Sequence, residues 1–364
     1  MITKIEISSD NLKVQFNNEN SETFPNIWLR DHAKDEVNWD KRSNQRKTFT
    51  AGLDLNLKIK NAEILENGKF LSILWPDLDK PVNYSYEFLS KNIVNNKKKS
   101  KYNIWKAKDL NSNIFFEFNE TKTKQGFKNF LKILYNYGFI VLKNCEKNMN
   151  PVEEIANKIG YVRNSIFGGL WSFQSNENKA DSAYTQEELR PHTDATYSND
   201  APGLQLLLCC EYSAEGGESI MVDGLKIAEE IKNSDNEIFN ILSNTNVKGN
   251  YIGDGVFLEA ERPIFKLNDN KEIIQVSFNN YDRAPFRFDN ELTKKFYKAI
   301  KKFDLIANDK NYQWRHILKP GELLIFNNWR ILHGRSSFSG TRKISGCYIN
   351  KEDFDSSCKI NGII

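Results

Sequence analysis

The sequence has 364 residues, of which 39% are hydrophobic, 12% aromatic and 27% charged, and its formal net charge is +3. A chain of this length and composition can bury a substantial core and form one large globular domain or two. A net charge this small gives no reason to expect a nucleic-acid partner, and no stretch has the length or apolar character of a transmembrane helix or signal peptide. The five cysteines are odd in number and lack metal-type spacing, so we expect a cytoplasmic protein without disulfides.

Residues 1–95 are predicted to form a small β-rich domain. Short segments of alternating polar and apolar residues are separated there by Gly, Asn and Pro, which is typical of strands joined by turns. The clearest of these segments are 12–16, 55–59 and 70–75. The polar stretch 95–101 contains three consecutive lysines and is interpreted as a solvated linker rather than a phosphate-binding patch.

Residues 105–364 are expected to form a second, larger domain. Apolar residues at helical spacing and suitable end signals predict three helices, around 127–135, 151–159 and 292–303. Apolar runs predict strands at 139–142, 203–210, 323–326 and 344–349, and a turn at 268–270 predicts a hairpin. Because strands outnumber helices, the pattern favours a mainly β (α+β) fold, with a barrel or double-sheet core and helices packed outside it.

The most informative motif is His192-Thr193-Asp194, which is followed far downstream by His333. Two histidines and one carboxylate leave three positions open on a metal ion, and this ligand set suits a non-heme Fe(II) oxygenase. The His-x-acid pair alone is unspecific in a chain with 48 acidic residues, so the surrounding residues carry the argument. His32 and His316 have no such context and are expected to be structural or surface residues.

The surrounding segments resemble the γ-butyrobetaine and trimethyllysine dioxygenases, which are taurine-dioxygenase-like Fe(II)/2-oxoglutarate oxygenases. The resemblance rests on segments 28–31, 75–77, 190–197, 201–205, 216–224 and 326–335. It covers nearly the whole chain in the expected order. It implies a double-stranded β-helix (jelly-roll) core with flanking helices, which holds one Fe(II) and uses 2-oxoglutarate and O₂ as co-substrates.

The same resemblance assigns the centre of the site. The metal ligands and catalytic residues that it implies are His192, Asp194 and His333. Arg342 lies nine residues after His333 and matches the family's cation for the far carboxylate of 2-oxoglutarate, a role that suits a bidentate guanidinium. Ser219 and Leu207 are also placed at the co-substrate, Ser219 through its hydroxyl. The alternatives are that these histidines are ordinary core residues and that Arg342 forms a salt bridge, while Arg335 is expected to brace the ligand strand.

An aromatic cage is a further implication of the resemblance. A trimethylammonium group has no hydrogen to donate, so proteins hold it against the faces of aromatic rings. The matching positions are Phe167, Trp171, Tyr184 and Tyr348. The family usually has tyrosine at the first position, so we expect Phe167 to give a weaker or reshaped cage. The alternative is that these are ordinary core aromatics in a chain with 24 Phe, 14 Tyr and 7 Trp.

Asp181 and Asn280 are placed at the other end of the substrate. An acid at position 181 resembles the trimethyllysine enzyme, where it would meet the substrate's ammonium group, whereas the γ-butyrobetaine enzyme has asparagine. Asn280 would bind the substrate carboxylate in either case, although Arg283 or Arg287 would equally suit a phosphonate.

The expected function is hydroxylation of a small trimethylammonium compound of the γ-butyrobetaine or trimethyllysine type, as in carnitine biosynthesis. One alternative keeps the iron chemistry but acts on a trimethylammonium phosphonate or a sulfonate. Another is a catalytically silent β-barrel that only binds a ligand. The resemblance also implies a homodimer.

One departure from the family concerns its N-terminal domain, which often binds zinc through cysteines that follow the motif at 28–31. No cysteine precedes Cys145 in this chain. Because these soft ligands are missing, we expect no structural zinc.

Overall fold

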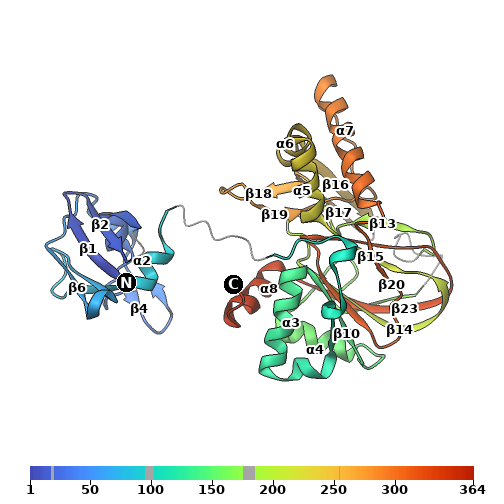
Figure 1. Ribbon diagram of the computed structural model, residues 1–364, viewed down its shortest axis with the longest axis horizontal. Helices are drawn as coiled ribbons and strands as arrows, with labels where there is room; N and C mark the ends of the chain where they lie inside the picture. The colour runs from blue at the N-terminus through green and yellow to red at the C-terminus, as the bar shows by residue number, and fades with distance from the viewer. Residues whose placement is uncertain (18–19, 95–101, 175–184, 254) are drawn as a thin grey trace. The chain divides into compact units, whose positions relative to one another are not determined.

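The computed structural model describes residues 1–17, 20–94, 102–174, 185–253 and 255–364 (Figure 1). The chain divides into two compact units, Met1–Ser100 and Lys101–Ile364. The stretch 95–101, which was expected to be a linker, lies outside the described residues.

The N-terminal unit contains two three-stranded antiparallel sheets, β1-β2-β3 and β6-β7-β8, with short helices and a two-stranded ribbon between them. Its elements are β1 (Ile2–Ile7), β2 (Asn11–Phe16), β3 (Ser21–Pro25), α1 (Asn26–Asp31), β4 (Trp39–Asp40), β5 (Gln45–Arg46), β6 (Asn61–Leu65), β7 (Phe70–Leu74), β8 (Val82–Ser85) and α2 (Tyr86–Lys91). Alternation along β2 buries Leu12, Val14 and Phe16 in one core with residues of β7. The prediction of a β-rich N-terminal domain is confirmed.

The strand predicted at 55–59 is wrong. Asp54 starts a turn there, because its Oδ1 accepts a hydrogen bond from the Asn56 amide at 2.9 Å and its carbonyl accepts one from Leu57 at 3.3 Å. Leu57 and Ile59 still pack against the N-terminal core, while Leu55 is exposed. The apolar alternation therefore reflects an irregular segment lying on the core, without a partner strand.

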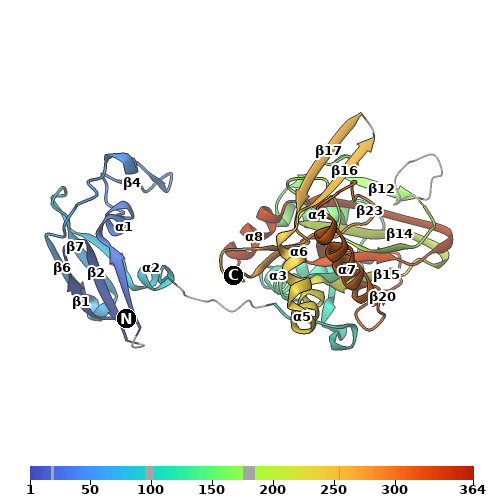
Figure 2. The ribbon, with the colours of Figure 1, turned by 90° about the horizontal axis from the view of Figure 1, so that it is seen from above.

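The second unit has two β-sheets that face each other and helices on both outer sides (Figures 1 and 2). The larger sheet has the order β11-β23-β14-β21-β10-β9, with β12 also paired to β23, and the smaller sheet has the order β13-β22-β15-β20. The strands of the two sheets are β9 (Phe115–Glu117), β10 (Phe139–Lys143), β11 (Val162–Arg163), β12 (Trp171–Gln174), β13 (Leu189–His192), β14 (Leu204–Gly216), β15 (Ser219–Asp223), β20 (Trp314–His316), β21 (Leu323–Asn327), β22 (Ile331–Arg335) and β23 (Phe338–Ile349). The remaining elements are α3 (Lys124–Tyr137), α4 (Asn150–Ile159), α5 (Gly224–Ser234), α6 (Asn236–Asn244), α7 (Asn290–Ala307), α8 (Lys351–Ile360) and the hairpins β16 (Val247–Gly253) with β17 (Val256–Arg262) and β18 (Phe265–Leu267) with β19 (Ile273–Val276).

Three apolar clusters hold these layers together. Helices α3, α4 and α8 cover the outer face of the larger sheet, and α5, α6 and α7 cover that of the smaller sheet. Between the sheets, Phe139 and Phe326 of the larger sheet pack in one cluster with Met221 and Ile331 of the smaller one. Each inner residue alternates along its strand with neighbours that pack against the helices, as the two-residue period of a strand requires.

The same alternation positions the predicted site. The following site residues lie on inward-facing positions of four strands: Leu207 on β14, Ser219 on β15, His333 on β22, and Arg342 and Tyr348 on β23. Because all of them lie on strands, the register of the two sheets fixes their spacing.

Most predicted elements of this unit are confirmed, but the unit contains more helix than expected. Helix α3 ends at Gly138, which has the left-handed φ of +81° that favours glycine, and the hairpin β18–β19 surrounds the predicted turn. Helices α5, α6 and α8 and the hairpin β16–β17 were not predicted. The sequence-based description as mainly β therefore holds in part: the fold is a mixture of α and β.

Candidate active site

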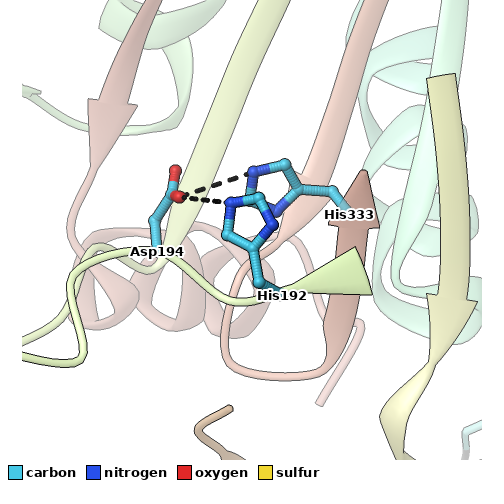
Figure 3. A group of neighbouring side chains, drawn as sticks. All are labelled: His192, Asp194 and His333. Carbon is cyan, nitrogen blue, oxygen red and sulfur yellow. Dashed lines mark ion pairs between the residues drawn. The ribbon is translucent and has the colours of Figure 1, made fainter. Parts of the chain in front are cut away.

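His192, Asp194 and His333 come together at the edge where β13 pairs with β22 (Figure 3). His192 and His333 are directly opposite each other in the antiparallel register, and their ring centroids are 4.4 Å apart. Asp194 Oδ1 lies 3.4 Å from His192 Nε2 and 3.5 Å from His333 Nε2. These separations are longer than ordinary N–H···O hydrogen bonds of about 2.9 Å and suit three groups that share one small cation.

The environment of Asp194 and His333 also fits a divalent metal ion. Burial alone would raise the pKa of the Asp194 carboxyl, but the His333 and His192 imidazoles and the Tyr348 hydroxyl outweigh burial and hold that pKa well below its usual range. Burial lowers the pKa of His333 to about 4. An ionised carboxylate and a neutral imidazole are the forms that bind a metal ion. The ligand atoms of His192, Asp194 and His333 all lie within 4.8 Å of one another. In the part of the chain that the structure describes, no other group of three or more His, Asp, Glu or Cys residues is gathered in this way.

Asn328 holds the backbone of Asp194 in place. Its Oδ1 accepts a hydrogen bond from the Asp194 amide at 2.8 Å, and its Nδ2 donates to the Asp194 carbonyl at 3.1 Å and to the Pro202 carbonyl at 3.0 Å. The residue is 1% exposed and lies in the turn between β21 and β22. Ala195, which follows the ligand, has a φ of +56°, a conformation that a residue with a side chain adopts only when its surroundings enforce it.

Thr193, which lies between His192 at the end of β13 and Asp194 in the following loop, connects this loop to the segment that carries Asn280. Its amide donates to the Phe278 carbonyl at 2.8 Å, and its Oγ1 accepts from the Phe278 amide at 2.9 Å. His192 is held from the other side, since its Nδ1 lies 2.8 Å from the Arg190 carbonyl oxygen. The bonds on both sides fix the direction in which His192 Nε2 points.

A cavity between the two sheets contains the residues predicted to bind the co-substrate. Leu207, Ser219 and Arg342 line it together with His192 and His333. Burial lowers the pKa of the Arg342 guanidinium. In the described part of the chain, Arg342 has no ion pair with a carboxylate, so the cavity presents an unpaired cation next to the metal-ligand group. We call this space, including the lining residue Arg335, the co-substrate cavity.

Aromatic rings lie next to the metal-ligand group on the side of β23. Trp171 is 5.8 Å from Tyr348 and 6.5 Å from Phe167 between ring centroids. The Tyr348 hydroxyl donates to Asp194 Oδ2 at 2.7 Å. Phe173, which the sequence did not single out, lies 4.4 Å from Trp171 and 5.4 Å from Phe167. We call Phe167, Trp171, Phe173 and Tyr348 the aromatic cluster.

The Trp171 ring comes close to the backbone of β23 because its partner in the register is Gly346. A Cβ atom at position 346 would be 2.4 Å from Cη2 of Trp171 and 2.2 Å from the Leu206 carbonyl oxygen. No side chain fits in that space, so glycine is required for this close approach.

The predicted substrate-binding residues beyond the aromatic cluster are only partly described. Asn280 lines a hollow together with His192, Tyr281 and Arg283, between β13 and α7. Asp181 and Tyr184 lie outside the described residues.

Two family models match this chain. Residues 3–90 match the model named gamma-butyrobetaine hydroxylase-like, N-terminal, and residues 108–348 match that of the taurine catabolism dioxygenase TauD, TfdA family. The chain belongs to the TauD, TfdA family. The family predicted from the sequence is confirmed, as are a dioxygenase and its reagents Fe(II), 2-oxoglutarate and O₂.

Curated relatives of this TauD, TfdA family member extend over most of its length. It is 32% identical to the mitochondrial trimethyllysine dioxygenase of Rattus norvegicus, over 93% of this chain and 83% of that protein. It is 28% identical to the trimethyllysine dioxygenase of Meyerozyma guilliermondii, over 100% and 96%, and 26% identical to the gamma-butyrobetaine dioxygenase of Homo sapiens, over 92% and 89%. A solved asparagine oxygenase in complex with Fe(II) matches with a TM-score of 0.49 at 15% identity, over 64% of this chain and 79% of that one, a likeness too distant to support a conclusion.

Sequence reasoning missed several residues of this TauD, TfdA site. The alternation of Trp171 and Phe173 could have indicated that both rings lie on one face of a strand. Asn328 gave no such signal, since its role depends on a backbone 134 positions away in the sequence.

None of the described helices combines the length and the apolar character that crossing a membrane requires.

Proposed function

We propose that this chain hydroxylates a small trimethylammonium compound of the trimethyllysine or γ-butyrobetaine type. The observation that carries the proposal is the double contact of Tyr348. Its ring lies 5.8 Å from that of Trp171, and its hydroxyl donates to Asp194 Oδ2 at 2.7 Å. A cation bound against these aromatic faces would therefore be held directly beside the metal-ligand group.

The proposed ligands of Fe(II) are His192, Asp194 and His333. Iron bound there would supply the activation of O₂, with one oxygen atom going to succinate as 2-oxoglutarate loses CO₂ and the other converting a C–H bond of the substrate to C–OH. The chain's own residues orient the reactants: Asn328 and Tyr348 hold Asp194, and the Arg190 carbonyl holds His192.

Arg342, Ser219 and Leu207 are the proposed contacts of 2-oxoglutarate. Among the described residues no acid competes for the Arg342 guanidinium, which is offered to the far carboxylate, and Ser219, a residue that is 3% exposed, offers a hydroxyl. Leu207 covers the apolar middle of the molecule. For the substrate we propose contacts with Phe167, Trp171, Asp181, Tyr184, Asn280 and Tyr348. The names of the relatives support this class, and the contiguous Phe167, Trp171 and Tyr348 support the cage.

The test is a succinate assay with the full chain. The protein is loaded anaerobically with Fe(II), then mixed with O₂ and 2-oxoglutarate, alone or with trimethyllysine, γ-butyrobetaine or a trimethylammonium phosphonate. We expect one trimethylammonium acid to raise succinate formation and to appear as its hydroxylated product. Stimulation by the phosphonate alone would favour the alternative substrate class and a role for Arg283, which lines the hollow with Asn280.

The matched control is the carbon isostere of the active compound, in which a quaternary carbon replaces the quaternary nitrogen. It has the same shape but no positive charge, so an aromatic cage should bind it more weakly. Equal stimulation by both compounds would show that the rings act only as an apolar wall. Uncoupled 2-oxoglutarate turnover that no compound stimulates would refute the substrate class.

We also propose a finer fold, domain division and setting for the enzyme. Two facing sheets with helices outside support a double-stranded β-helix in the oxygenase domain of residues 105–364, preceded by the β-rich domain of residues 1–95. Five buried free cysteines support the reducing cytoplasm. The homodimer rests on the family resemblance, and sedimentation of the full chain tests it.

A further inference from the structure

Arg335 is a second arginine in the co-substrate cavity. It is the last residue of β22, two positions after His333, so both side chains lie on the same face of the strand. It is 7% exposed and lines the cavity together with Arg342. In the described part of the chain, neither arginine has an ion pair with a carboxylate. Arg335 is buried and Arg342 is half-buried, and two guanidinium groups placed in one cavity are unfavourable unless an anion joins them.

Part of the Arg335 guanidinium is already bonded, and part is not. Its Nη2 donates to the carbonyls of Thr185 and Glu187, at 2.7 Å each. Its Nε is buried and has no hydrogen-bond partner among the residues that the structure describes, and its central carbon lies 4.8 Å from the Phe338 ring centroid. A buried charged donor without a partner is costly, and it indicates that a group is missing from its surroundings.

The position of Arg335 connects two parts of the site. Its register partners are Ser219 on β15 and Leu189 on β13, the strand that ends at His192. Its bonds to Thr185 and Glu187 hold the segment that leads into β13. A ligand that contacts Arg335 would therefore act on the cavity and on segment 185–189 at the same time.

We propose that Arg335 is a second positioning residue for 2-oxoglutarate, which with Arg342 neutralises the carboxylate remote from the metal and ties co-substrate binding to segment 185–189. This rests on the proposed function only in the assignment of Arg342 to that carboxylate. A dianionic ligand is required, because a monoanion that uses its one carboxylate at the metal leaves both arginines unpaired.

The test measures co-substrate binding without turnover. The full chain is loaded with Zn(II) in place of Fe(II) and titrated calorimetrically with 2-oxoglutarate and with pyruvate, a 2-oxo acid that lacks the remote carboxylate. We expect Arg335→Gln to weaken 2-oxoglutarate binding about 10- to 100-fold, which is the effect of losing a hydrogen bond to a charged group. The same variant should weaken pyruvate binding less than about threefold, because pyruvate has no remote carboxylate. Equal weakening of both ligands, or of neither, would overturn the proposal.

Two further variants keep the result interpretable. Arg315→Gln on β20 removes an arginine of the same sheet whose partner is Glu218 at 3.0 Å, so it should leave both affinities unchanged. Arg335→Lys keeps the charge but loses the planar fork, and we expect an intermediate loss for 2-oxoglutarate. If the glutamine variant fails to fold, the lysine variant still discriminates between the two ligands.

Hydrogen exchange provides a second readout. Binding of 2-oxoglutarate should slow amide exchange in segment 185–189 of the wild type and leave it unchanged in Arg335→Gln. Equal slowing in both proteins would exclude the connection to that segment. These binding experiments contain no trimethylammonium compound, so they do not depend on the substrate class. If Arg335→Gln behaves as expected but the wild type hydroxylates none of the proposed substrates, only the substrate class is refuted.

Discussion

The metal-ligand group and the aromatic cluster lie next to each other, but they are held by different forces. The backbone and side chains around Asp194 are fixed by directional hydrogen bonds from Asn328, Thr193 and Tyr348. The aromatic cluster is held mainly by ring packing on β12 and β23. Directional bonds fix distances to a few tenths of an ångström, whereas packed rings tolerate changes of shape. The comparison implies that the chemistry is rigidly specified and that the choice of substrate can be altered with small changes.

The largest effect is expected at the metal ligands. His192→Ala removes one of three donor groups, so we expect the loss of both bound Fe(II) and succinate formation. The matched control is His316→Ala, which removes a histidine of the same unit that bonds to Glu322 at 2.8 Å and should keep its activity. Metal analysis and the succinate assay check both variants. Turnover that survives in the His192 variant would refute the ligand assignment.

Asn328→Ala tests the rigid side of the comparison without touching a ligand side chain. We expect metal affinity to fall roughly 10- to 100-fold, as is typical when a group that orients a ligand is lost. The control is Asn26→Ala in the N-terminal unit, an equally buried asparagine that donates to the carbonyls of Ser9 and Leu57. Both variants should lower the free energy of unfolding. Only the first should weaken metal binding in a competition titration, and equal metal affinities would refute the positioning role.

Trp171→Leu tests the aromatic cluster, which is held by ring packing. It keeps an apolar side chain but removes the aromatic face, so we expect the KM of the trimethylammonium substrate to rise about 2- to 30-fold, the range of one cation–π contact. The KM of the isosteric neutral analogue should change little, which separates loss of the cation contact from general loosening. If both compounds lose affinity equally, Trp171 contributes only packing.

Phe167→Tyr is expected to have the smallest effect. Phe167 is half-buried at the rim of the aromatic cluster, so a hydroxyl can be added there without removing any ring contact. We expect the KM for the trimethylammonium substrate to fall by no more than about twofold, because the added hydroxyl cannot form a hydrogen bond with a quaternary ammonium group and the ring offers the cation a similar face. A rise in KM would mean that the cluster is already shaped around phenylalanine.

The sequence predicted those parts of the molecule whose cause is local. Helices α3, α4 and α7 and strands β10 and β21 have strong apolar periodicity and clear end signals, so their bounds agree closely with the predictions. The segment 55–59 shows the opposite case, because Asp54 formed a turn that apolar alternation could not reveal. Helices α5, α6 and α8 were missed: they are about as long as α4 but lack the Pro in the first turn and the Gly at the C-cap that marked it.

The same distinction applies to the site. The three proposed ligands and Arg342 were assigned from the resemblance of their sequence motifs to the family, which the sequence alone can reveal. Asn328, Phe173 and the unpaired Nε of Arg335 depend on neighbours that only the folded sheets bring together. The absence of a structural zinc remains a prediction from the missing cysteines. One tightly held zinc per full-length chain in a metal analysis would contradict it.

Gly346 determines which residues of the aromatic cluster can be replaced without disturbing the fold. Any side chain there would collide with Trp171 and with the backbone of β14, so a substitution at position 346 should displace one of them and lower the stability of the fold. Phe167 is half-buried, and its ring centroid lies 6.5 Å from that of Trp171, so its side chain has more room to change. An engineer who wants this enzyme to accept a bulkier quaternary ammonium compound should therefore keep Gly346 and Trp171 constant and randomise position 167.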